Sequence, residues 1–199
     1  DGIDPDVAEA MAAASQGHIG RARGLARDPA ARQRRREILS LPTELRTIGD
    51  CVTAAQAVVE AATAHASGLA DTSEADELSD LRQTWGVEER GRRPAGYAGA
   101  LSSLEKDQTR RRKRLALDSI DGVLLELLSL CRDVIASQLG SGTGFVNADA
   151  IEQIAALARL WTPESTIRTI DAIVGCREAL AANAAAPLAL ERMMLELRS

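Results

Sequence analysis

The sequence has few aromatic residues, and this shortage limits the folds that it can form. Only 2% of the 199 residues are aromatic, whereas 45% are hydrophobic, and most of these are alanine and leucine. Small and γ-branched side chains of this kind pack helices closely together and are poorly suited to a β-sandwich. We therefore expect an all-α fold.

Histidine and cysteine are also scarce. The chain has two histidines, three cysteines and no CxxC pair, so no spacing typical of a metal site occurs. Cys51, Cys131 and Cys176 lie far apart within apolar helical patterns. We expect three buried thiols in a reducing, cytoplasmic setting, and neither a bound metal nor a cofactor.

Long apolar runs are missing as well. No segment approaches the ~18 apolar residues that a membrane span needs, and no signal segment is evident. The net charge of −5 argues against a global attraction to nucleic acid or to an anionic membrane, so any such contact must be local. The first residue is Asp1 rather than methionine, which suggests a fragment of a longer protein.

Helix starts are marked where a proline directly follows a capping residue. The capping oxygen can accept an unpaired backbone N–H, and proline at the next position has no N–H to satisfy. The three such pairs are Asp4-Pro5, Asp28-Pro29 and Thr162-Pro163. We expect the first helix to end near Ser15 with Gly17 as a left-handed cap, and a second short helix to reach about Arg27.

The middle of the chain predicts two long helices. The first should end near Gly68, with a short helix at 74–84 and a mobile Gly- and Pro-rich linker at 86–98 after it. The second should run from Leu101 to about Leu139, with its second half buried. The apolar stripe of the first is Leu45, Ile48, Val52, Ala55, Val59 and Ala62. The stripe of the second is Ile120, Leu124, Leu127, Leu128, Cys131, Val134 and Ile135.

Three more helices complete the chain, at 147–161, 163–182 and 187–198. The whole is predicted as a small helical unit at 1–40 followed by a five- or six-helix bundle at 43–199.

Charged clusters are interpreted first as surface. The run 110–114, with Lys106 before it, spreads over more than half of a helix circumference and has no interleaved aromatics, which favours a solvated or acid-paired face over a phosphate-tracking stripe. We interpret residues 34–37 as helix surface too. Arg132 and Asp133 are adjacent and point to different faces, so each is expected to find a separate partner.

No catalytic constellation is recognisable. The segment 17–23 could present N–H groups and arginine to a phosphate, but no GxxxxGK[ST] motif exists, so a complete nucleotide site cannot be built from it. Its other interpretation is a helix–turn–helix corner. Because no nucleophile and base are paired in the sequence, we expect no catalytic residues and no enzyme activity.

Three stretches, in this order, resemble the C-terminal two-thirds of the δ′ subunits of bacterial DNA polymerase III clamp loaders, which are AAA+-related. Ala14–Ala22 is similar to the A-G-S-x-G-x-A element of their small helical lid domain. A second set of residues is similar to the entry helix of their collar domain: Leu104–Gln108, followed by Arg114, Leu117, Asp118 and Arg132–Val134. Their last collar helix is resembled by Ala181–Asn183 with Leu188–Glu191 and Leu195. Two features depart from the family: Ala184–Ala186 precedes Pro187 where a proline usually follows the asparagine directly, and 71–98 reads as a lineage-specific linker.

The resemblance implies a partial AAA+ lid at 1–40 and a collar domain at 43–199, without the nucleotide-binding domain. Such a part would be non-catalytic and would assemble with the gamma/tau and delta subunits through its collar helices, to load the sliding clamp in DNA replication. DNA would be met only indirectly, through the complex, and no membrane would be involved.

The resemblance also implies a degenerate nucleotide site. In ATP-binding relatives the fourth position of Gly-x-x-Arg carries a sensor arginine, whereas here Gly17 is followed by Gly20 at that position and by Arg21 one place later. A shift of one residue rotates a side chain by ~100° around a helix. The sensor contact is therefore expected to be lost.

The main alternative is a ligand-binding and dimerisation bundle of a transcriptional regulator. It would need a DNA-reading helix–turn–helix within 5–27, which offers only Arg21, Arg23 and Arg27 to bases. A helical enzyme with an unrecognised site is a third possibility.

Overall fold

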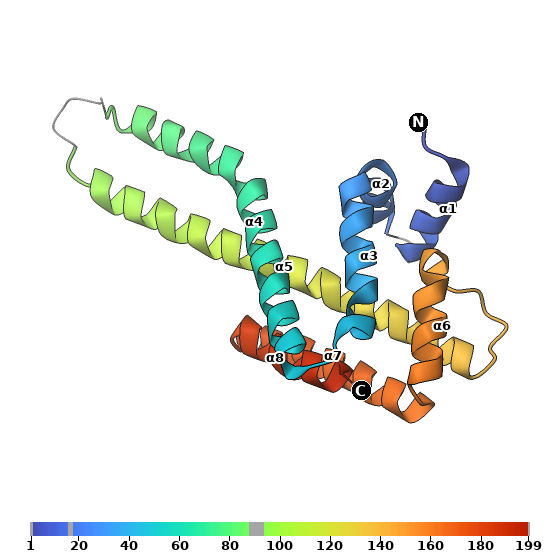
Figure 1. Ribbon diagram of the computed structural model, residues 1–199. Helices are drawn as coiled ribbons and strands as arrows, with labels where there is room; N and C mark the ends of the chain where they lie inside the picture. The colour runs from blue at the N-terminus through green and yellow to red at the C-terminus, as the bar shows by residue number, and fades with distance from the viewer. Residues whose placement is uncertain (1, 16–17, 88–93, 199) are drawn as a thin grey trace. The chain divides into compact units, whose positions relative to one another are not determined.

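All regular structure in the computed structural model is helical (Figure 1). The model describes residues 2–15, 18–87 and 94–198, and no strand occurs within these ranges. The predicted all-α class is confirmed. The helices are α1 (Pro5–Ala14), α2 (Ile19–Arg27), α3 (Pro29–Glu44), α4 (Ile48–Thr84), α5 (Tyr97–Gln138), the 3-10 turn η1 (Ala148–Ala150), α6 (Ile151–Leu160), α7 (Pro163–Ala181) and α8 (Ala186–Leu197).

The three predicted proline starts are confirmed. The carboxylate of Asp4 accepts a hydrogen bond from the Asp6 N–H at 2.9 Å, and that of Asp28 accepts one from Ala30 at 2.9 Å. Thr162 and Ser165 form a reciprocal capping box at the start of α7. These caps satisfy N–H groups that have no partner inside the helix.

The predicted break near Gly68 is wrong, because α4 is one helix of 37 residues. An interior glycine costs about 1 kcal/mol relative to alanine, and this is less than the gain from burying a continuous face. Ala66, Ala70 and Glu74 are all buried, so the helix packs on both sides of the glycine. Packing therefore overrides the local preference.

The chain divides into two compact units. The first unit comprises Asp1–Gln56 and Gly122–Ser199, and the second comprises Ala57–Asp121. The predicted boundary at 40–43 falls within α3, and the division into lid and collar remains a prediction.

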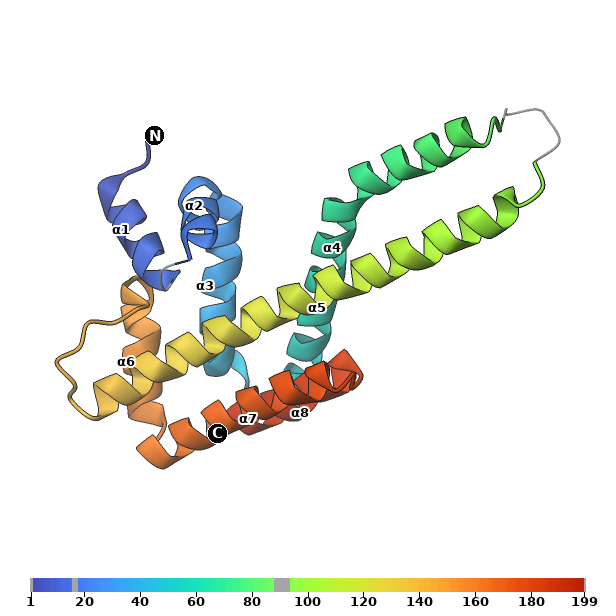
Figure 2. The same cartoon turned by 180° about the vertical axis from the view of Figure 1, so that it is seen from behind.

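The first unit has its core around the second half of α5. Within it α7 packs on α8, α1 on α2, α2 on α3 and α3 on α6, and the two views show α7 and α8 side by side (Figure 2). Leu128 and Ile135 are only half-buried, whereas the rest of the predicted stripe of α5 is buried. The largest fully buried side chains of the first unit include Leu39, Leu124, Leu127, Leu130, Ile154, Leu157, Ile173, Leu190, Met193, Met194 and Leu197.

The stripe predicted for α4 is partly wrong. Leu45, Ala55 and Ala62 are buried, but Ile48 is 61% exposed. The buried face follows Cys51, Ala55, Val58, Ala62, Ala66, Ala70 and Glu74.

The second unit is an antiparallel pair made by residues 57–84 of α4 and 97–121 of α5 (Figure 1). Ala62, Ala66 and Ala70 are buried at every fourth position of α4. At the far end Trp85 and Tyr97 meet edge to face, with ring centroids 6.3 Å apart. Gly96 has a φ of +91°, a backbone conformation that favours glycine. A Cβ there would lie 3.1 Å from the Trp85 ring, which is a tight contact.

The linker predicted at 86–98 is shorter on its C-terminal side, because α5 already begins at Tyr97. Residues 88–93 of that linker lie outside the described residues. No helix in the described ranges is long and apolar enough to cross a membrane.

Candidate functional site: a buried ion-pair cluster and the exposed faces of α7 and α8

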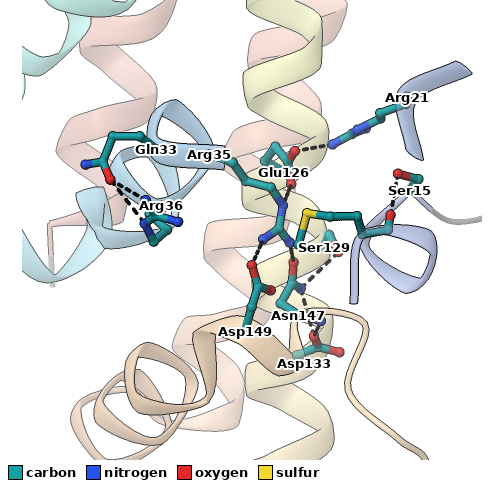
Figure 3. Close-up of polar contacts among 11 residues, drawn as sticks. Ser15, Arg21, Gln33, Arg35, Arg36, Glu126, Ser129, Asp133, Asn147 and Asp149 are labelled. Carbon is teal, nitrogen blue, oxygen red and sulfur yellow. Dashed lines mark hydrogen bonds and ion pairs between the residues drawn. The ribbon is translucent and has the colours of Figure 1, made fainter. Parts of the chain in front are cut away.

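Arg35 is the centre of a buried polar cluster in the first unit (Figure 3). It lies on α3 and is only 2% exposed. Its Nε donates to Glu126 Oε2 at 3.1 Å, one terminal nitrogen donates to Asp149 Oδ2 at 2.5 Å, and the other donates to Asn147 Oδ1. One guanidinium group thus joins α3, α5 and the segment at η1.

Asp133 forms the second half of this cluster. Its carboxylate is fully buried and accepts hydrogen bonds from the backbone N–H groups of Val146 at 3.2 Å and Asn147 at 2.7 Å. The Asn147 side chain donates to Asp133 at 2.7 Å and to the Ser129 hydroxyl at 3.0 Å. The acid on α5 therefore fixes the backbone that enters η1.

The prediction for Arg132 and Asp133 is partly wrong, because the two residues pair with each other in addition to binding a separate partner each. The Arg132 guanidinium lies 2.6 Å from Asp133 Oδ1 and also donates to the carbonyl of Gly144 at 3.3 Å. The Arg132 side chain is 46% exposed, whereas that of Asp133 is fully buried. A long flexible side chain can reach around the helix in a way that the Cβ direction does not show.

Of the residues predicted for the degenerate nucleotide site, two are described. Gly17 lies outside the described residues. Gly20 lies in the first turn of α2 and is exposed. A Cβ added at Gly20 would have the His18 ring as its neighbour within 4 Å. The guanidinium of Arg21 forms an ion pair with Glu126, the same carboxylate that binds Arg35. The arginine therefore points into the chain's own cluster.

The cluster is suited to holding helices in place. It brings together the guanidinium groups of three arginines and three carboxylates, which are Arg21, Arg35, Arg132, Glu126, Asp133 and Asp149. No cysteine, histidine or lysine belongs to it, and among the described residues no group of His, Cys, Asp and Glu is arranged to bind a metal. Charges taken out of water destabilise a fold unless each is paired, so every member depends on the others.

Sequence reasoning missed Arg35 because three adjacent arginines suggested helix surface. The signal that could have found it is the register of α3. Arg35, Leu39 and Pro42 are its buried positions, spaced at i, i+4 and i+7. A charged residue in phase with an apolar stripe must be buried with partners.

The three cysteines are buried, as predicted, and are at most 5% exposed. Burial raises the pKa of the Cys131 thiol to about 12 and that of Cys176 to about 11, because the thiolate is poorly solvated in the interior. Such thiols are inert core residues at neutral pH.

A shallow groove of about 290 Å³ lies between α7 and α8. Its lining combines small and charged side chains. The residues that line it are Arg168, Asp171, Ala172, Gly175, Cys176, Ala179, Ala189, Arg192, Met193 and Glu196.

Large apolar side chains are exposed beside this groove. On α8, Leu188 is 67% exposed and Leu195 is 40% exposed, and the i, i+7 spacing places them on one face with Arg192 between them. On α7, Ile167 and Val174 are 53% and 39% exposed at the same spacing. Large exposed apolar patches mark sites of protein contact, and these four side chains are candidates for such a site.

The comparisons with known proteins concern this part of the chain. Residues 113–199 match the family model described as "DNA polymerase III, delta subunit, C terminal". No curated protein and no solved structure matches the chain. The match spans residues 113–138 of α5, η1, α6, α7 and α8, which is less than half of the chain. It supports a relationship to the clamp-loader subunits of DNA polymerase III, and it does not distinguish δ′ from other subunits.

Proposed function

We propose that this chain is a non-catalytic assembly part of a DNA polymerase III clamp loader, of the δ′ type, acting in the cytoplasm. The match of residues 113–199 to the family of C-terminal regions of delta subunits carries the clamp-loader part of this proposal. The δ′ type rests on the three sequence stretches, in their order, that resemble that subunit. The helices that match include α7 and α8, which present the exposed apolar faces beside the groove. Their role would be to bind the collar helices of gamma/tau and delta subunits.

The degenerate state of the lid is part of the same proposal. Arg21 is held by Glu126, so its charge is already neutralised within the chain. A nucleotide contact by Arg21 would have to break this pair and leave a 7% exposed carboxylate with one partner fewer. We therefore propose that residues 1–40 brace the fold rather than bind ATP.

The proposal is tested by light-scattering mass of the chain, alone and mixed with purified gamma/tau and delta subunits. The informative variant is Leu188→Asp with Leu195→Asp, which places two charges on the exposed face of α8. The matched control is Ile48→Asp with Leu139→Asp, since these side chains are 61% and 70% exposed and lie outside α7 and α8. Circular dichroism checks that each variant is folded.

We expect the wild type and the control to enter a larger complex. The α8 variant should bind at least ten-fold more weakly, because it would bury two unpaired carboxylates in the interface. A stable self-dimer that ignores the loader subunits would overturn the proposal. It would favour the dimerisation bundle of a transcriptional regulator instead.

A further inference from the structure

In the second unit, the basic residues of one run on α5 lie on two opposite faces of the helix. Residues 106–114 contain six basic residues and one acidic residue. Arg111 lies 2.6 Å from Glu77, and Arg112 pairs with Glu74, so both side chains point toward α4. Gln108 also faces α4, where it donates to the Glu74 carbonyl at 3.3 Å and to Glu77 at 3.1 Å.

The other four basic residues share the face that points away from α4. Lys106, Arg110, Lys113 and Arg114 follow the spacing i, i+4, i+7 and i+8, which confines them to about 100° of the helix circumference. All four are exposed, and we call them the basic stripe. The six basic residues together spread around the helix. The four that do not pair with acids of α4 form one narrow row.

The basic stripe is poorly neutralised by its surroundings. Arg110 has a side chain that is 79% exposed and meets Asp107 at 3.3 Å. Lys106, Lys113 and Arg114 make no ion pair with any residue in the described ranges. The nearest acids of α4, Glu74 and Glu77, already bind Arg111 and Arg112.

We propose that the basic stripe binds the phosphate backbone of duplex nucleic acid. The stripe is about 12 Å long at 1.5 Å per residue, which suits contacts to a few successive phosphates. No aromatic residue lies between 98 and 144, so the stripe offers no platform for stacking the bases of a single strand. Contacts to phosphates alone carry no base sequence preference. This proposal goes beyond the assembly role and does not depend on it.

The test uses the full chain and a fluorescent 20-base-pair DNA duplex of arbitrary sequence, with anisotropy measured at about 50 mM salt because binding of this kind weakens steeply with salt. The stripe variant is Arg110→Glu with Arg114→Glu. The charge-matched control is Arg46→Glu with Arg159→Glu, two exposed arginines of the first unit. Both variants change the net charge equally.

We expect the stripe variant to bind the duplex at least ten-fold more weakly than the control. The slope of log affinity against log salt should fall by about two, that is by about one for each phosphate that is no longer bound. The same duplex should bind more tightly than a single strand of equal length. Equal binding by both variants, or none by the wild type, would overturn the proposal.

Lysine footprinting gives a second readout, because Lys106 and Lys113 are the only lysines of the chain. Bound duplex should protect both from an amine-reactive reagent, as measured by mass spectrometry. Unchanged labelling of both lysines at saturating duplex would contradict the proposal. Binding to vesicles with anionic lipid, without binding to the duplex, would also contradict it and assign the stripe to a membrane surface.

Discussion

Arginine–carboxylate pairs occur in both compact units, but their surroundings differ. In the first unit Arg35 is 2% exposed, and its partners come from distant parts of the chain, α5 and the segment at η1. In the second unit Arg111 and Glu77 have side chains that are 42% and 31% exposed. Water screens the second pair and competes for it, whereas the first has no replacement for a missing partner. The same chemistry therefore fixes the fold in one region and mainly adjusts surface charge in the other.

The largest effect is expected from Arg35→Met. The variant keeps much of the side-chain volume but leaves Glu126 and Asp149 without their shared partner. Removing one member of a buried ion pair costs about 3–5 kcal/mol. Urea unfolding followed by circular dichroism measures the loss. A fall in the free energy of unfolding of less than about 1 kcal/mol would contradict this account, because it would show that water reaches the cluster in solution.

A smaller loss is expected from Asp133→Ala. The side chain accepts hydrogen bonds from two backbone N–H groups and from Asn147. Hydrogen bonds to a charged group are worth about 1.5–3 kcal/mol, and the buried donors would lose their acceptor. Unfolding in urea gives the stability, and hydrogen exchange should show faster opening of residues 145–150. Unchanged exchange in that segment would contradict the role assigned to Asp133.

The capping box of α7 should contribute less to the free energy of unfolding than either Arg35 or Asp133. Thr162→Ala removes the hydroxyl that accepts from the Ser165 N–H at 3.2 Å. Loss of such a cap costs about 1 kcal/mol. The midpoint of urea unfolding should fall by a corresponding amount with no change in slope. Thr143→Ala is the control, because Thr143 lies in an exposed loop outside any helix.

The exposed pair of the second unit should give the smallest effect. Arg111→Ala is expected to leave the unfolding midpoint nearly unchanged at moderate salt. The hydrogen bond from Arg111 holds the pKa of the Glu77 carboxyl below its usual value of 4.5. Its contribution is therefore present above that value and is lost as the pH falls through the lowered pKa. Any difference between wild type and variant should vanish in acid. A difference that grows in acid would contradict this account.

The sequence predicts the elements of this fold better than its buried polar contacts. The capping chemistry of Asp4, Asp28 and Thr162 is local, so three helix starts could be located from the sequence. The break expected at Gly68 failed because the packing of α4 along its whole length is a tertiary effect. Local signals fix where a helix starts, and tertiary burial decides how far it continues.

The Arg35 cluster could not be assembled from the sequence because Arg35 and its partners are about a hundred residues apart. Glu126 is 91 positions from Arg35 and Asn147 is 112 positions away. The register of α3 could have shown that Arg35 is buried, but it does not identify the partners. The basic stripe differs, because its helical spacing can be read from the sequence. Only the structure shows that Arg111 and Arg112 do not belong to it, since they pair with Glu77 and Glu74.

The most direct test of the assembly role is hydrogen–deuterium exchange of the chain, free and in a mixture with gamma/tau and delta subunits. The account predicts new protection in α7 and α8, centred on residues around Leu188 and Leu195, and little change within residues 57–84. Protection restricted to the second unit, or no change anywhere, would contradict the claim that the exposed faces of α7 and α8 bind the other subunits.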